Sequence, residues 1–244
     1  MLYLGLIFTG AIAWFISTLT AGGAAMLVIP ILGIMLGVEL VAPVLSIATV
    51  VTNPARAFMF RRFIRLDVIR WLLPGSLVGA VIGSFVLSYS EPLWVQLVLG
   101  LLLSTTFLQY RFGKSKRSFT VSAWWFMPLG LGVAMLSAIT GATGPILNPF
   151  LLNYGLIKED MVGTKSFNSL FMQLTKVGAY ISLGLMSGQA WLAGLALGAG
   201  AIIGAWLAKR QFANISAAQF RYGVIAMMTL SGVVMLLDAV RRLF

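Results

Sequence analysis

The sequence predicts an all-α integral membrane protein with about 8–10 transmembrane or re-entrant helices. These helices are expected to form two homologous repeats in inverted orientation, each with a helix pair broken at a glycine cluster. Three observations support this prediction: an apolar composition, the recurrence of long apolar segments, and similar motifs at corresponding places in the two halves of the chain.

The composition excludes a soluble domain. Of the 244 residues, 60% are hydrophobic and 9% are charged, and the mean hydropathy is +0.99, whereas soluble domains carry roughly 25% charged residues. Apolar runs of about 18 or more residues recur along the chain, and each is long enough to cross a bilayer as a helix. A transmembrane β-barrel would instead alternate apolar and polar residues, which this sequence does not do.

Ten apolar segments can be marked, five on each side of a polar linker. They cover roughly residues 3–20, 24–38, 40–60, 70–89, 93–110, 121–139, 144–157, 161–184, 189–208 and 217–239. This division predicts an N-terminal transmembrane repeat over 1–110, a basic cytoplasmic linker over 111–120 and a C-terminal transmembrane repeat over 121–244.

The two halves carry similar motifs. "TAGGAAMLVIPIL" begins at Thr20 and "TGATGPILNPFL" begins at Thr140, and both place a glycine cluster and then a proline in a short apolar helix. A glycine-spaced helix follows later in each half. Close helix packing alone would explain these glycines, but an internal duplication explains the whole pattern. The spaced glycines are Gly75, Gly79, Gly83, Gly194, Gly198 and Gly204.

The distribution of Lys and Arg predicts the topology. The basic segments 61–70 and 111–117 indicate the cytoplasmic side, as does 208–211, while the uncharged segment 185–189 should face out. With five segments per half, both termini lie outside and the repeats are inverted. The alternative treats each broken pair as a single span and gives parallel repeats, although about 36 residues is long for one span. Whether the broken segments span or are re-entrant is left open.

The composition also limits the chemistry. The chain has no cysteine and no histidine, and only six acidic residues, which excludes disulfides, thiol chemistry and His/Cys metal sites. We therefore expect no enzyme, no cofactor and no metal. The net charge is +11, and most of the basic residues lie in short loops, which indicates topology signals rather than a nucleic-acid surface. The expected partners are a small anion and the lipid bilayer of a bacterial inner membrane, with a homodimer left open.

Two features suggest a site for that anion. The glycine-rich breaks at 20–24 and 140–145 should expose helix N-termini, whose free N–H groups and dipoles attract anions; the alternative is an ordinary tight loop. In addition, Arg56, Lys165 and Lys176 fall within apolar segments, where a cation costs about 2.5–3.5 kcal/mol and usually faces a cavity. Snorkelling to the interface is the alternative for Arg56 and Lys165. The predicted substrate-binding residues are Thr20, Gly22, Gly23, Thr49, Asn53, Arg56, Thr140, Gly141, Thr143, Gly144, Lys165, Asn168, Gln173 and Lys176.

Four segments resemble the TauE/SafE family, the sulfite exporter or TSUP membrane proteins. They are "AGGAAMLVIP", "TGATGPILNP", "VGTKSFN" and "RLDVIRW", and together they cover both halves. The first glycine cluster is shorter than that family's usual one, and Lys165 stands where a serine is common. The resemblance implies a transporter of sulfite, sulfonates or other small sulfur-containing or organic anions.

The residues and the resemblance together predict a secondary transporter that works by alternating access. The broken-helix N-termini and the Lys, Arg and Asn groups between the repeats would hold the anion. An anion channel with the same electropositive lining is the nearest alternative, followed by a membrane enzyme or a non-transporting scaffold. The choice between a uniporter, an exchanger and a carrier of a protonated anion is left open, because no acidic residue lies clearly within an apolar segment.

Overall fold

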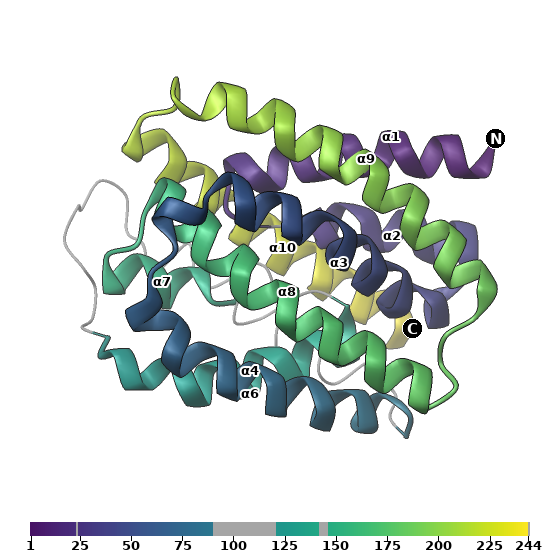
Figure 1. Ribbon diagram of the computed structural model, residues 1–244. Helices are drawn as coiled ribbons and strands as arrows, with labels where there is room; N and C mark the ends of the chain where they lie inside the picture. Colours follow the sequence, from purple (N-terminus) through teal and green to yellow (C-terminus); the bar gives the residue numbers. More distant parts are fainter. Residues whose placement is uncertain (23, 90–120, 142–145, 244) are drawn as a thin grey trace.

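The computed structural model describes residues 1–22, 24–89, 121–141 and 146–243, and every regular element in those ranges is helical (Figure 1). The α-helices are α1 Leu2–Leu19, α2 Ala24–Leu36, α3 Val41–Met59, α4 Leu66–Leu87, α6 Phe126–Thr140, α7 Asn148–Tyr154, α8 Lys158–Ser182, α9 Gly188–Phe212 and α10 Ala217–Leu243. Single 3-10 turns lie at Val38–Leu40, Arg61–Phe63 and Ala123–Trp125. The all-α prediction is confirmed. The predicted segment 93–110 and linker 111–120 lie outside the described residues.

Helix length separates the helices that can cross a bilayer from those that cannot. Among the described residues, α1, α3, α4 and α9 are long and apolar enough to do so, and large apolar side chains such as Phe8 and Phe85 are more than half exposed on their outer faces. The chain is therefore a multi-pass membrane protein. In contrast, α2 has 13 residues and α7 has 7, so they rise only about 20 and 10 Å. Neither crosses a hydrocarbon core of about 30 Å on its own.

The helices of the two halves pack reciprocally. The first helix of one half lies against the fourth helix of the other, as α1 does with α9 and α6 does with α4. Between these two pairs lie α3 and α8, which contact each other, and each also contacts the nearer pair (Figure 1). Two homologous repeats would produce such reciprocity; the repeats and their inverted orientation both stay predictions.

Glycines permit the close approach of both outer helix pairs. A β-carbon at Gly79 in α4 would overlap the carbonyl of Leu131 in α6, and one at Gly204 in α9 would overlap the carbonyl of Ala11 in α1. Small residues at such positions let helix backbones touch, and the contact is then held by van der Waals packing. The spaced glycines of the sequence therefore serve packing in the structure.

This packing predicts opposite effects for two glycine substitutions. Gly79→Ala is expected to destabilise the fold by about 1–3 kcal/mol, because the new methyl group meets backbone that cannot move aside. Gly132→Ala, in the facing helix α6, meets nothing within 4 Å and should be neutral or stabilising by about 0.5–1 kcal/mol. Thermal unfolding of both variants in detergent measures the difference, and equal melting temperatures would contradict this account of the interface.

Candidate functional site

A cavity of about 100 Å³ lies between residues of both halves. Its walls come from the end of α1, the first turn of α2, the C-terminal half of α3, the middle of α4, and α8. Val133 of α6 and Leu147, just before α7, also contribute. The cavity therefore lies where the broken helices meet the two central helices, α3 and α8.

Many of the predicted site residues line this cavity. They are Gly22, Thr49, Asn53, Arg56, Gly141, Lys165, Asn168 and Gln173. Thr20 and Lys176 do not belong to the lining. Gly23, Thr143 and Gly144 lie outside the described residues, and of Thr140 only the backbone, at the last position of α6, is described.

The break in the first half is a tight turn between α1 and α2. Ala21 adopts the left-handed conformation at φ 51°, and the hydroxyl oxygen of Thr20 lies 2.9 Å from the carbonyl oxygens of both Ile16 and Gly22. Thr20 therefore stabilises the end of α1 rather than facing the cavity. Ala24 and Ala25, the first residues of α2, line the cavity, so the positive end of the α2 dipole adjoins it.

The break in the second half begins with the same left-handed backbone conformation after a threonine. Gly141 follows α6 in the left-handed conformation at φ 77°, and its N–H donates to the carbonyl of Ser137 at 2.9 Å. Gly141 thus occupies the place after a threonine that Ala21 occupies in the first half. It also lines the cavity, so both breaks reach the same space.

Lys165 connects the first break to the start of α7. This residue of α8 extends its ammonium group to the carbonyl oxygen of Ala21, in the first break, and to the side-chain oxygen of Asn148, the first residue of α7. The side chain therefore points into the protein, and the snorkelling alternative does not describe it. Its charge lies at the cavity, beside the polar groups of both halves.

Arg56 brings a second cation to the cavity from α3. The residue is 9% exposed, and its Nε is buried without a hydrogen-bond acceptor among the described residues. The ion pairs of the described residues are formed by Arg65 and Lys158, so no described carboxylate neutralises Arg56. A buried, uncompensated cation is costly in a membrane, which points to an anionic ligand as its partner.

Further buried polar atoms around the cavity lack partners within the described part of the chain. The side-chain nitrogen of Asn53, one turn before Arg56, is one of them, as are the hydroxyl of Ser166 and the side-chain oxygens of Asn168 and Gln173. Asn168 also donates to the hydroxyl of Ser76 in α4 at 3.0 Å. Buried polar groups are normally hydrogen-bonded, and an amide can present either its oxygen or its NH₂ group after a flip. The cavity is therefore equipped for a polar ligand.

Lys176 is also buried, but it binds protein. Its ammonium group donates to the carbonyl oxygen of Ser137 at 3.1 Å and lies 3.2 Å from the hydroxyl of the same residue. Tyr180, one turn later in α8, donates to the carbonyl of Ala138 at 2.7 Å. The last carbonyls of a helix lack partners within it and form the negative end of its dipole. Lys176 and Tyr180 thus hold α8 to the C-terminal turn of α6.

Sequence reasoning missed several residues of the cavity. They are Trp14, Ser17, Ser76, Ser166 and Ser169. Asn148, which is not in the lining but binds Lys165, was also missed. A serine in an apolar helix usually serves packing, so its type carries little signal. Spacing could have found Ser17, because it precedes Thr20 by the same three positions that separate Ser137 from Thr140.

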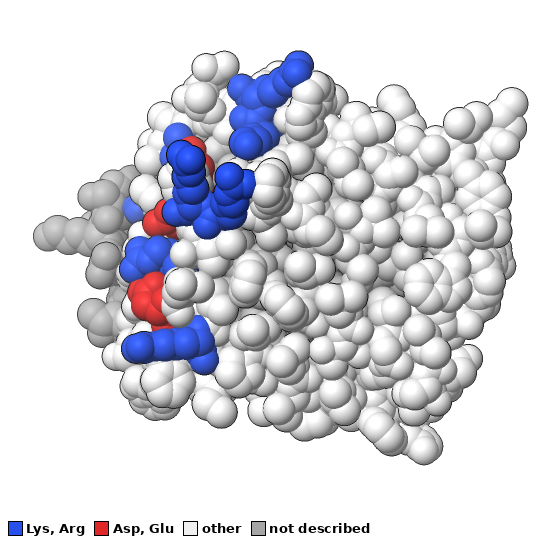
Figure 2. Space-filling model, in the orientation of Figure 1, with Lys and Arg blue, Asp and Glu red and all other residues white. Residues whose placement is uncertain are grey.

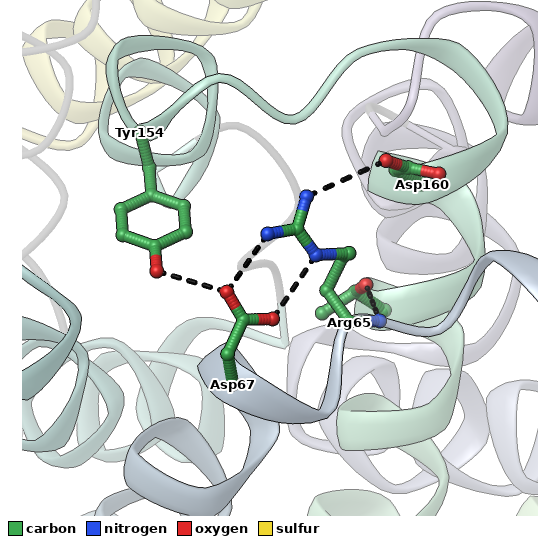
Figure 3. A network of polar contacts seen from close by, with 5 residues as sticks. Arg65, Asp67, Tyr154 and Asp160 are labelled. Atoms are coloured by element: carbon green, nitrogen blue, oxygen red, sulfur yellow. Dashed lines mark hydrogen bonds and ion pairs between the residues drawn. The ribbon is translucent and has the colours of Figure 1, made fainter.

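The charged side chains visible on one face of the molecule gather at one end (Figure 2). There Arg65, just before α4, binds Asp67 through two hydrogen bonds of 3.0 and 2.8 Å, and the bond to Asp67 raises the pKa of Arg65. Tyr154, at the end of α7, donates to the same carboxylate at 2.9 Å, and Asp160 of α8 lies 3.8 Å from the guanidinium (Figure 3). This network joins elements of both halves at the end that the basic loops predict to be cytoplasmic.

The comparison with protein families agrees with the motifs. The family model described as "Sulfite exporter TauE/SafE" matches residues 6–235, nearly the whole chain and both halves. Comparisons with curated proteins and with solved structures found no match. The resemblance read from the sequence is thereby confirmed. The chain, an all-helical membrane protein whose motifs and family match agree, belongs to the TauE/SafE sulfite exporter family, a family of transporters.

Proposed function

We propose that this protein is a secondary transporter of the bacterial inner membrane that carries a small sulfur-containing or organic anion by alternating access. The observation that carries the proposal is the cavity between the two halves, with Arg56 and Lys165 in its lining and no carboxylate among its described residues. Two cations at one buried place favour an anion, and the adjoining N-terminus of α2 adds to the positive potential.

The dimensions of the cavity favour a small substrate. At about 100 Å³ it is smaller than the roughly 300–1,000 Å³ of pockets for drug-sized ligands. It still exceeds the roughly 10–15 Å³ that one water needs. A compact oxyanion such as sulfite, or a short sulfonate or carboxylate, suits this space and can accept several hydrogen bonds at once from Arg56 and Asn53.

The network at the charged end supports alternating access. Arg65 and Asp67 belong to the first half, and Tyr154 and Asp160 to the second, so their contacts hold the halves together beyond one end of the cavity. Movement of one half against the other would break and remake such contacts while the central site persists. Because the described lining offers no carboxylate and the chain has no histidine, exchange, uniport or movement of a protonated anion is favoured over a proton relay.

Transport by the purified protein in liposomes tests the proposal. Uptake of radiolabelled sulfite, a short sulfonate and a short carboxylate should be saturable and exceed that of protein-free liposomes. Preloading with unlabelled anion should accelerate uptake if the protein is an exchanger. Flux that rises linearly with concentration would instead indicate a channel, and no uptake of any anion by folded protein would refute the proposal.

A further inference from the structure

A second hollow, which we call the basic groove, lies at the charged end of the molecule and apart from the central cavity. It has a volume of about 820 Å³ and is formed by the end of α3, the turn that follows it, and the end of α9. Its basic residues are Arg61 and Arg62 on one side, and Lys209 and Arg210 on the other. Because α3 and α9 are both candidate membrane spans, the basic groove lies at the membrane surface.

No carboxylate among the described residues balances the charge of the basic groove. All four cations are exposed, and its described lining contains no carboxylate. The acidic residues that form ion pairs nearby are bound to Arg65 and Lys158 instead. Topology signals alone require basic residues on one side of the membrane, but they do not require four of them, from two helices distant in the sequence, to converge on one hollow.

Aromatic side chains give the basic groove an apolar border. Phe58 is 69% exposed and Trp206 is 44% exposed, and Arg61 and Arg210 lie over these rings at 4.4 and 3.5 Å from the centroids. Aromatic rings at this depth are typical of residues that contact the headgroup region of a bilayer. The exposed apolar face of α9 continues from here towards the membrane interior with Ile203.

From this geometry we infer that the basic groove binds the headgroup of an anionic phospholipid. The phosphate would lie among the four cations, and the acyl chains would follow the exposed face of α9. A phospholipid joins both chemistries in one molecule, and basic pockets between transmembrane helices on the cytoplasmic side are suited to such headgroups. Neither a water-soluble anion nor a nucleic acid would use the exposed aromatic and aliphatic border.

Occupation of the basic groove would affect the central helices. Phe60, the residue directly after α3, packs edge to face on Phe212, the last residue of α9, with ring centroids 5.4 Å apart. The same helix α3 carries Asn53 and Arg56 into the cavity. The helices α3 and α9 belong to different halves of the chain. A headgroup that binds the ends of both helices would therefore stabilise the contact between the two halves.

Lipid-dependent thermal unfolding of the full chain in detergent tests this inference. Phosphatidylglycerol should raise the melting temperature saturably, and phosphatidylcholine and water-soluble glycerol phosphate should not. The groove variant Arg62→Gln/Lys209→Gln should need about 30-fold more phosphatidylglycerol for half of the effect, at roughly fivefold per basic residue. If that variant does not fold, Arg62→Gln alone should show the fivefold change.

The matched control is Arg70→Gln/Arg221→Gln, which also removes two positive charges, but from residues outside the basic groove. It should respond to phosphatidylglycerol like the wild type. An equal loss in the control would mean that general surface charge attracts the lipid, and an equal effect of glycerol phosphate would mean that the ligand is a soluble anion. Either result, or stabilisation by phosphatidylcholine to the same extent, would overturn the inference.

Discussion

Arg56→Gln is expected to raise the KM for the transported anion by about 100-fold or more, while the protein stays folded. Truncating one partner of a buried, hydrogen-bonded charge pair costs about 2–5 kcal/mol, and Arg56 is the cavity cation whose Nε has no acceptor among the described residues. No described carboxylate pairs with Arg56, so its removal leaves no negative charge unpaired in the described part of the chain.

The same reasoning predicts the effect on stability. Without substrate, Arg56→Gln should unfold at the same temperature as the wild type or higher, because a buried cation without a described carboxylate partner carries a desolvation penalty that the glutamine avoids. An arginine kept for structure would behave in the opposite way, and its loss would lower the melting temperature.

Uptake kinetics and thermal unfolding of the same preparation measure both effects. Arg56→Lys keeps the charge but loses the planar fork that binds an oxyanion with two parallel bonds, so its KM should fall between those of the wild type and Arg56→Gln. Arg70→Gln, at the surface and outside the cavity, should transport like the wild type. Unchanged uptake by Arg56→Gln would contradict the site.

The sequence predicts the helices well and the cations only in part. Long apolar segments locate α1, α3 and α9 to within a few residues, because membrane insertion depends on local composition. Arg56 and Lys176 look alike at this level, since each is a cation deep in an apolar segment. In the structure, Lys176 differs from Arg56 because it donates a hydrogen bond to Ser137, a residue 39 positions away in the sequence. A contact between residues so far apart cannot be predicted from the local sequence pattern.

Residue type also limits what can be predicted of the cavity. Asn53 is conspicuous in an apolar helix, but serines such as Ser76 and Ser166 are not, because small hydroxyl residues are common where helices pack. Likewise Arg61 and Arg210 read as topology signals along the chain, and only the meeting of the α3 and α9 ends reveals that they share a groove. Composition and spacing therefore do not predict which common residue types meet in space to form a site.

Lys165→Met and Lys176→Met should therefore differ sharply, although they make the same chemical change on the same helix. Lys165 lines the cavity and binds Ala21 in the first break and Asn148 at the start of α7. Its loss removes a cavity charge and leaves two acceptors without this donor, and each unsatisfied buried group costs about 1–3 kcal/mol. We expect the KM of Lys165→Met to rise about 100-fold, as for a buried charge partner.

Lys176→Met removes a cation that is more deeply buried than Lys165, but one that binds α6 outside the lining of the cavity. Its KM should stay within about threefold of the wild type, since a residue without substrate contact changes affinity only through positioning. Uptake over a range of anion concentrations, normalised to folded protein in each liposome preparation, compares the two. If both variants raise the KM equally, the anion site extends along α8 to Lys176, and the cavity is only one part of that site. If only Lys176→Met raises the KM, the site lies at the end of α6, and the assignment to Arg56 and Lys165 fails.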